Sequence, residues 1–207
     1  MIMDYKNISV TFIDNSLIKN SADAFRKKYW DDTIPVDIEK IIDVKIGIDV
    51  IPSPGLQLLC DVDALIYSDW KSIIVDHNKY FDGRYQNRLR FSYAHEIGHF
   101  ILHKDIHKSL KIKSTKDFQK FIKEIPQIQY GYLETQANKF ANFLLIPRER
   151  LIIEKEKEIK RKEINDLINS GKLDKKTVNP YLAIPLSKIF GVSEDAMEIA
   201  LNETDGI

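Results

Sequence analysis

Two histidines and a glutamate stand close together near the middle of the chain, in the order His95-Glu96-x-x-His99. On a helix, residues four positions apart lie on the same face, so both imidazoles can bind one zinc ion. Glu96 would then lie beside a water molecule activated by the metal, where it can act as a general base. Apolar neighbours such as Ile97 and Phe100 predict a buried helix, in which this polar trio is costly without a metal or a cleft.

A catalytic zinc ion needs a third protein ligand, and later residues offer several candidates. His103 continues the spacing, but it lies two turns, or about 11 Å, beyond the first histidine, which excludes it from the same coordination shell in a regular helix. Asp105 occupies the position of the last ligand in HExxHxxGxxH enzymes, but Leu102 replaces the glycine that turns the chain there. His107 lies in a lysine-rich segment, and we expect it at the surface.

Glu134 is the strongest candidate because it opens a second predicted helix, 134–145. It shares a face of that helix with Ala137, Asn138 and Ala141, and the small alanines would allow a close approach to the first helix. Two histidines and a glutamate from a later helix are the ligands of thermolysin-like zinc peptidases. Glu134 could equally be a first-turn glutamate that the helix dipole stabilises, and spacing alone leaves both interpretations open.

Composition limits the classes of protein that need to be considered. The 207 residues are 43% hydrophobic and 30% charged, as in a globular protein of ordinary size. Lys+Arg and Asp+Glu are both 31, so charge gives no reason to expect nucleic acid or an anionic membrane as a partner. Cys60 is the only cysteine, which excludes an intrachain disulfide. We recognise no signal peptide and no membrane span, and therefore expect a cytoplasmic protein.

The hydrophobic pattern predicts an α+β fold. Strands are expected at 46–51, 61–67 and 72–76, in a small antiparallel or mixed sheet, and a short β-like run covers 8–13. Helices are predicted at 21–30 (with Ser21 as N-cap), 35–42 (opened by Pro35), 85–103, 117–123, 134–145 and 148–169, and a last pair lies on either side of Gly191.

Two segments of the chain resemble the ImmA/IrrE family of bacterial metallopeptidases: RFSYAHEIGHFILH at 90–103 and ETQANKFANFLLIP at 134–147. Further likeness lies in PVDIEKI at 35–41, SIIVDHN at 72–78 and LSKIFGVSEDAMEIAL at 186–201. The resemblance spans roughly 35–201 and implies a zincin-like domain, with a small N-terminal sheet, an active-site helix and a helical C-terminal part. It divides the chain into an N-terminal extension (1–34), a metallopeptidase core (35–147) and a helical C-terminal subdomain (148–207).

The resemblance also implies an activity. His95, His99 and Glu134 would bind Zn²⁺ and Glu96 would activate water in a zinc-dependent endopeptidase. The implied partner is a protein substrate, a DNA-binding helix-turn-helix repressor or a similar regulatory protein, whose cleavage releases genes of mobile elements or stress responses. Residues 1–34 are too few for a helix-turn-helix domain, so repressor and peptidase would be separate proteins. The alternative is a non-catalytic regulatory or toxin–antitoxin-type binding module on the same fold, which would have no need of Glu96.

Several further features have more than one interpretation. Tyr93, His103, Tyr130 and Tyr132 could each stabilise an oxyanion, although packing is the commoner role for such residues. The segments 104–130 and 148–169 are less typical of the family and could shape substrate choice or merely elaborate the surface. The end of the chain is patterned like a helix-turn-helix, but 186–207 has a net charge of −4 and is a poor phosphate binder. We therefore expect it to serve packing or protein contact.

Overall fold

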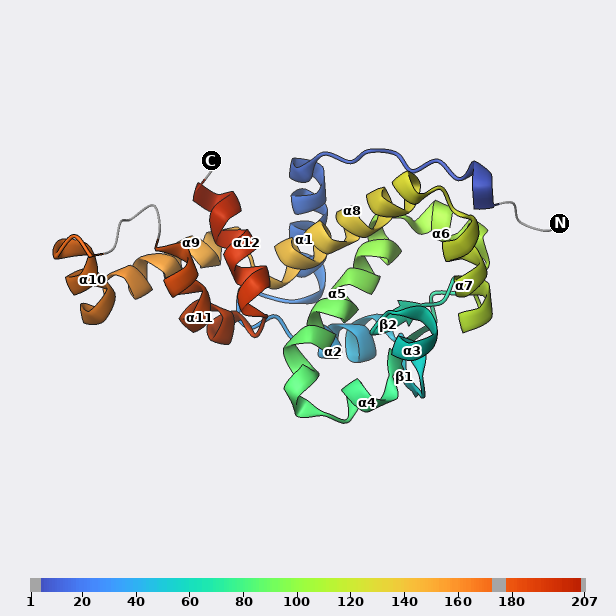
Figure 1. Cartoon of the computed structure of the whole chain (residues 1–207), viewed down its shortest axis with the longest axis horizontal. Helices are drawn as coiled ribbons and strands as arrows, with labels where there is room; N and C mark the ends of the chain where they lie inside the picture. The colour runs from blue at the N-terminus through green and yellow to red at the C-terminus, as the bar shows by residue number, and fades with distance from the viewer. Residues whose placement is uncertain (1–4, 173–177, 206–207) are drawn as a thin grey trace.

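Two long helices beside a small sheet form the centre of the molecule (Figure 1). The computed structural model describes residues 5–172 and 178–205. The helices are α5 (Gln86–Leu102) and α8 (Gln127–Leu145), and they pack directly against each other. The predicted helix 85–103 is therefore confirmed, whereas the second helix starts seven residues before the predicted Glu134.

The sheet has three strands in the order β1-β3-β2. They are β1 (Asp49–Ser53), β2 (Ala64–Ile66) and β3 (Ser72–Asp76). β1 is parallel to β3 and β2 is antiparallel to it, so the sheet is mixed, which is one of the two arrangements expected, and the α+β class is confirmed. In the central strand β3, which has a neighbour on each side, Ile73 to Val75 are buried, and all three residues of β2 are buried as well.

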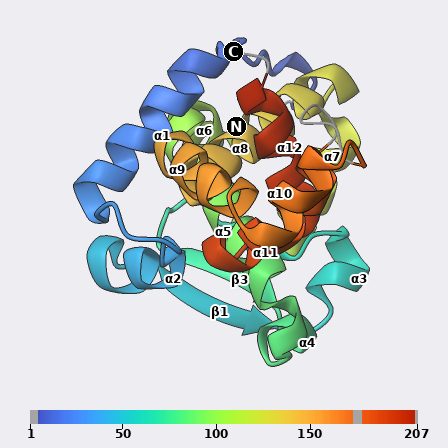
Figure 2. The ribbon, with the colours of Figure 1, turned by 90° about the vertical axis from the view of Figure 1, so that its left-hand side faces the viewer.

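A third helix, α1 (Asn15–Tyr29), packs against α8 through Ile18, Ala22 and Phe25, which recur at helical spacing and are buried. Figures 1 and 2 show α1 and the sheet on opposite sides of α5. The helix begins earlier than predicted because Asp14 caps it: its Oδ1 accepts a hydrogen bond from Ser16 N at 2.8 Å. The predicted N-cap Ser21 is instead a mid-helix residue bonded to the Leu17 carbonyl.

The run 8–13 is not a strand. Its backbone groups bond to side chains of α8 rather than to a neighbouring strand: Val10 N donates to Gln129 Oε1 at 2.6 Å, and Thr11 O accepts from Gln136 Nε2 at 3.0 Å. Figure 1 shows this segment passing over α8 on its way to α1. The β-like pattern was therefore misleading, because α8 satisfies the hydrogen bonds that a strand would otherwise need.

Shorter elements complete the fold. They are η1 (Tyr5–Asn7), α2 (Ile38–Lys40), the π-helical η2 (Ile41–Ile46), α3 (Leu56–Cys60), α4 (His77–Tyr80), η3 (Gly83–Tyr85), α6 (Lys104–Leu110), α7 (Thr115–Glu124), α9 (Arg148–Ile159), α10 (Lys162–Asn169), α11 (Asn179–Phe190) and α12 (Glu194–Asp205). The helix expected from Pro35 begins only after Asp37, whose Oδ1 accepts from Lys40 N at 2.9 Å.

The single helix predicted at 148–169 is wrong, because the chain breaks into α9 and α10. Arg161 is extended, with a ψ of 140°, and caps the start of α10. This break places the Arg161 guanidinium 3.0 Å from the carboxylate of Glu158, whose side chain is only 4% exposed. No glycine or proline marks the break, so the sequence pattern could not reveal it.

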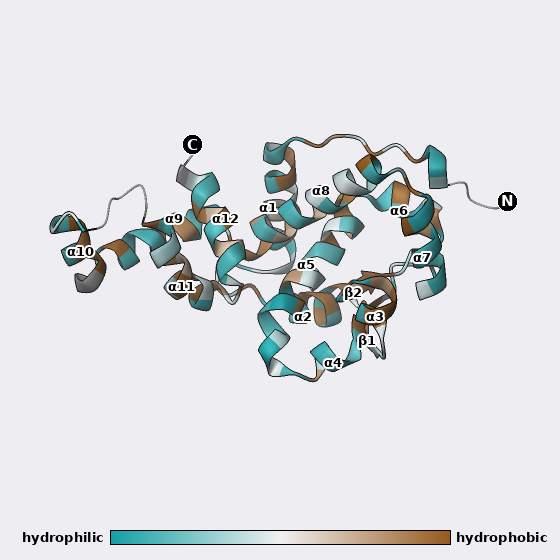
Figure 3. Cartoon of the chain, in the orientation of Figure 1, coloured by the Kyte–Doolittle hydropathy of each residue, from teal (hydrophilic) through white to brown (hydrophobic). Residues whose placement is uncertain are grey.

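The C-terminal helices belong to the same hydrophobic core as α1, α5 and α8. Leu186, Phe190, Met197 and Leu201 are fully buried, which supports packing as the role of this helix pair. Figure 3 shows hydrophobic and hydrophilic residues alternating along α9 to α12, as expected for helices with one buried face. Among the described residues, no helix is both long and apolar enough to cross a membrane.

Candidate metal centre

Small residues allow α5 and α8 to approach each other closely. A Cβ atom placed on Gly98 would lie 3.0 Å from Ala137 Cα and 3.1 Å from Ala137 O, which is tighter than ordinary packing. Ala137 and Ala141 are themselves fully buried. The predicted role of these alanines in close helix packing agrees with this contact, which brings Glu134 to the histidines of α5.

Three side chains converge where the two helices meet. The Nε2 atoms of His95 and His99 are 3.0 Å apart, and carboxylate oxygens of Glu134 lie 3.4 Å from the first and 3.5 Å from the second. Ligands about 2.0–2.1 Å from a tetrahedral zinc ion are themselves about 3.3 Å apart, so these separations suit such an ion. Within residues 5–172 and 178–205, this is the one group of His, Cys, Asp or Glu side chains close enough to hold a metal.

The opposite ring nitrogens of both histidines have other partners. His95 Nδ1 lies 2.8 Å from Asn138 Oδ1, and His99 Nδ1 lies 3.0 Å from His103 Nδ1. A histidine that donates its Nδ1 proton in this way presents a lone pair at Nε2. The donor set is therefore two imidazole nitrogens and a carboxylate, which leaves the fourth position of a tetrahedral zinc ion for water or substrate.

The electrostatics of the group favour a positive charge between its members. Burial lowers the pKa of His95, but the hydrogen bond to Glu134 and the charge of that residue outweigh burial and raise the pKa to about 9. Burial raises the pKa of Glu134, but contacts with His95 and His99 outweigh it and hold the pKa well below its usual range. A proton on His95 neutralises the negative charge of Glu134 in part, and a divalent cation bound between these side chains would stabilise that charge more strongly.

Glu96 lies on the same helix, between the two histidines, and is buried. Its Oε2 accepts a hydrogen bond from the backbone N–H of Ile66 in β2 at 2.8 Å. Burial raises the pKa of this carboxyl group, so that it holds a proton more readily than an exposed glutamate. The structure thus places the predicted base against the strand nearest to α5.

The other ligand candidates do not join the group. His103 is buried beside His99, where it binds Gln136 as well, and Asp105 is exposed on α6. The expectation that His107 is a surface residue is wrong: only 7% of it is exposed, and its ring packs against Trp70. Glu134 lies two turns inside α8, which removes the interpretation that it is a first-turn residue.

Only one of the four oxyanion candidates lines the cavity beside Glu134. That residue is Tyr130, whose pKa is raised by burial and by the nearby carboxylates, so its hydroxyl stays protonated. Tyr93 lines a different cleft, Tyr132 is 42% exposed, and the ring nitrogens of His103 are already engaged.

Two hollows meet at the donor group and share Val62, Ala64, His95 and Glu96 in their linings. The first is enclosed, and the segment 104–130 supplies much of its apolar wall: Leu110, Ile112, Phe118, Phe121 and Tyr130. The second is more open and polar, with Asp61, Ser92 and Asn138 in its lining. The segment 104–130 is therefore part of the site and not only surface elaboration.

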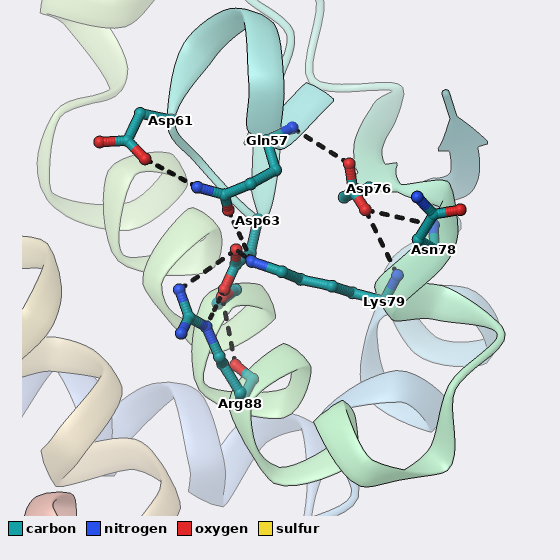
Figure 4. A network of polar contacts seen from close by, with 8 residues as sticks. Gln57, Asp61, Asp63, Asp76, Asn78, Lys79 and Arg88 are labelled. Carbon is teal, nitrogen blue, oxygen red and sulfur yellow. Dashed lines mark hydrogen bonds and ion pairs between the residues drawn. The ribbon is translucent and has the colours of Figure 1, made fainter. Parts of the chain in front are cut away.

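A buried carboxylate fixes the start of β2 next to these hollows. Figure 4 shows Asp63 between Lys79 of α4 and Arg88 of α5, with ion pairs to both. Asp76 at the end of β3 accepts hydrogen bonds from Gln57 N at 3.1 Å and from Asn78 N at 3.2 Å. This network ties the first turns of α5 to the sheet, and so sets the distance between the histidines and β2.

Sequence reasoning missed the residues that support the candidate ligands. The sequence places Asn138 on the face of Glu134 but indicates no role for it, and no pattern singles out Gln136, Asp63 or Ile66. The four-residue spacing from Glu134 to Asn138 was the one available signal.

Residues 84–202, more than half of the chain, match the model of the peptidase M78 family, described as the IrrE N-terminal-like domain. A search among curated proteins finds no match for the chain. The matched residues include α5, α8 and the C-terminal helices, and together with the small sheet they confirm the zincin-like fold. The chain belongs to the peptidase M78, or ImmA/IrrE, family of metallopeptidases.

Proposed function

We propose that this protein is a zinc-dependent endopeptidase that cleaves an intracellular DNA-binding regulator. The convergence of His95, His99 and Glu134 beside the buried Glu96 carries the proposal. Membership of a metallopeptidase family supports the same class of reaction. Zinc as the metal is favoured by the donor set, because two imidazoles and a carboxylate with one open side are typical of zinc hydrolases.

The roles of the side chains follow from their positions. A zinc ion on His95, His99 and Glu134 would polarise the scissile carbonyl group and make water more acidic. Glu96 takes a proton from the attacking water and delivers it to the leaving amine. Because Ile66 N–H holds Oε2, we assign this proton transfer to Oε1. The Tyr130 hydroxyl is the donor that we assign to the developing oxyanion.

The outer edge of β2 offers a place for an extended peptide. On either side of β2, Asp63 O accepts a backbone hydrogen bond from Asp76 N at 2.9 Å, and Tyr67 N donates one to Ser72 O at 3.1 Å. Because backbone direction alternates along an antiparallel strand, the N–H and C=O groups of Ala64 and Ile66 point away from β3. The Ile66 N–H holds Glu96, and Ala64 lines both hollows. A substrate chain paired with this edge would run past Glu96 in both directions, which favours cleavage within a chain over trimming of its ends.

The substrate class that we propose is a DNA-binding regulator with a helix-turn-helix. It comes from what the resemblance to the ImmA/IrrE family implies, and the enclosed apolar hollow favours a hydrophobic side chain beside the cleaved bond. A helix-turn-helix repressor encoded next to this protein is the natural first substrate, and it implies a cytoplasmic location. No nucleic acid would be needed for the reaction.

The decisive experiment compares wild-type protein with Glu96→Gln. Both are loaded with zinc, their metal content is measured, and each is incubated with the purified neighbouring repressor. We expect about one zinc per chain in both proteins, and cleavage at least about 100-fold slower in the variant, because general acid–base catalysis contributes that much or more. Mass spectrometry identifies the cleaved bond.

Different outcomes would reject different parts of the proposal. Wild-type protein that takes up no zinc would remove the metal mechanism. Zinc uptake with equal cleavage by Glu96→Gln would remove Glu96 as the base. Zinc uptake with tight repressor binding but no cleavage would favour the non-catalytic binding module.

A further inference from the structure

A line of hydrogen bonds runs from His99 through the interior to the N-terminal segment. His99 Nδ1 lies 3.0 Å from His103 Nδ1, and His103 Nε2 lies 2.9 Å from Gln136 Oε1. Gln136 Nε2 then donates to Thr11 O at 3.0 Å. The three side chains are each less than 10% exposed, so water does not compete with these contacts.

The last partner fixes the direction of every bond in this line. A backbone carbonyl such as Thr11 O can only accept, so the Gln136 amide nitrogen must face it and the Gln136 oxygen must face His103. That oxygen accepts the proton on His103 Nε2, which leaves a lone pair on His103 Nδ1. The lone pair accepts the proton on His99 Nδ1, and His99 Nε2 is left with its lone pair toward Glu134.

This arrangement matters because a neutral imidazole has two tautomers. The tautomer with a proton on Nε2 could not bind a metal through that atom, and the hydrogen bond at Nδ1 decides which form is present. Partners that orient metal-binding histidines typically change metal affinity by about 10- to 100-fold when they are removed. His95 has a simple partner of this kind in Asn138, whereas His99 depends on a relay of two side chains and a backbone carbonyl.

The relay ends on a segment that α8 holds at two points. Gln129 and Gln136 are seven residues apart, so they lie on the same helix face, and they bond to Val10 N and Thr11 O respectively. Residues 8–13 therefore lie along α8 on the side of Gln129 and Gln136, as Figure 1 shows for their path to α1.

We propose that His103 and Gln136 are positioning residues, which hold His99 in the tautomer that binds the metal, and that the Thr11 carbonyl sets the direction of this relay. The inference rests on the proposed metal site but not on the proposed substrate. Residues 8–13 would then affect metal binding through Thr11, although they contribute no metal ligand.

The test measures zinc affinity by competition with a chromophoric chelator. His103→Leu removes the acceptor for His99, and we expect zinc binding about 10- to 100-fold weaker than in wild type. His103→Asn keeps an oxygen near the position of Nδ1, and should restore affinity to within a few-fold of wild type. Gln136→Leu breaks the relay one step further out and should weaken binding in the same direction, so a folding defect in one variant does not remove the test.

His107→Leu is the matched control. This histidine is also buried and its ring is 5.8 Å from that of His99, but its own Nδ1 lies 3.5 Å from Ser68 Oγ, outside the relay. Its loss should leave zinc affinity within a few-fold of wild type. Circular dichroism and thermal unfolding would confirm that all four variants are folded.

Nitrogen-15 NMR of the imidazole rings provides a second readout. In zinc-loaded wild type, we expect His103 to carry its proton on Nε2 and His99 to carry its proton on Nδ1. His103 protonated on Nδ1, or zinc affinity in His103→Leu and Gln136→Leu equal to wild type, would overturn the relay while leaving the peptidase proposal intact. A wild-type protein without zinc affinity would instead overturn the metal centre itself.

Discussion

At the residue scale, the candidate metal centre combines local spacing with one distant contact. His95, Glu96 and His99 come together because they share a helix face, as their spacing already required. Glu134 comes from α8 and reaches both histidines within 3.5 Å. Its carboxylate completes a donor set that otherwise has only two nitrogen atoms, so it should decide whether the site holds an ion.

Replacement of Glu134 tests this directly. Glu134→Ala should weaken zinc binding by more than the roughly 10- to 100-fold loss typical of supporting contacts, because a ligand and a negative charge are both lost. Thr135→Ala, the adjacent position on the same helix, is the control. Chelator competition measures both, and unchanged zinc affinity in Glu134→Ala would mean that the third ligand lies elsewhere.

At the element scale, the contact between α5 and α8 sets the geometry of the site. Gly98 and Ala137 meet without room for a further carbon atom, one residue from His99 and three from Glu134. A Cβ atom on Gly98 would require the backbone of Ala137 to move by a few tenths of an ångström, and so would strain the contact that positions ligands from different helices.

Two glycine-to-alanine substitutions separate the effect of this close contact on stability from the effect of helix propensity. Alanine is favoured in helices by about 1 kcal/mol, so Gly131→Ala in α8, with nothing within 4 Å of the added carbon, should stabilise the protein. Gly98→Ala should instead lower the free energy of unfolding by about 1 kcal/mol or more, because overpacking against backbone atoms costs about 1–3 kcal/mol. Urea unfolding measures both. Equal stabilisation by both substitutions would contradict the close contact.

The sequence predicted what depends on short-range spacing and failed where distant contacts decide. The strand at 72–76 and the helix of His95 and His99 followed from local periodicity, which left an antiparallel and a mixed sheet equally open. The start of α8 at Gln127 was not predicted, because Pro126 stands at the N-cap position and no side chain there marks the beginning of the helix. His107 was misplaced because its burial depends on α6 folding back toward Trp70, which no local pattern reveals.

At the scale of the whole molecule, one core extends from α1 through α8 to α12. Arg90 of α5 reinforces this continuity, since its guanidinium donates to Val36 O at 2.6 Å and also packs against Gly191. Helix α1 and the C-terminal helices therefore share one buried core with α5 and α8, and we expect these helices to unfold together.

Acid should destabilise the folded protein through His107. Burial, with the nearby His99 and His103, lowers its pKa to about 3, whereas an unfolded histidine has a pKa of about 6.5. The unfolded chain therefore binds a proton first, and stability falls as the pH drops below 6.5. Between pH 6.5 and 5 the loss from this residue should be about 2 kcal/mol.

Urea unfolding at pH 7 and pH 5, with chelator present throughout, would measure this effect. His107→Leu should lose about 2 kcal/mol less than wild type between the two pH values, while His77→Leu at an exposed position should behave like wild type. Parallel losses in wild type and His107→Leu would show that His107 does not carry this acid sensitivity.

The shortness of β2 limits what the proposed enzyme could attack. The strand has three residues, and only Ala64 and Ile66 turn their backbone N–H and C=O groups away from β3, with the N–H of Ile66 already bonded to Glu96. Such a short edge can pair with only a few residues of a substrate chain, and that chain must already be extended. The target would therefore be cut at a linker or at a segment that opens transiently, and the frequency of that opening would set the rate of cleavage. Control of the reaction could then lie in the flexibility of the substrate and leave the enzyme itself unchanged.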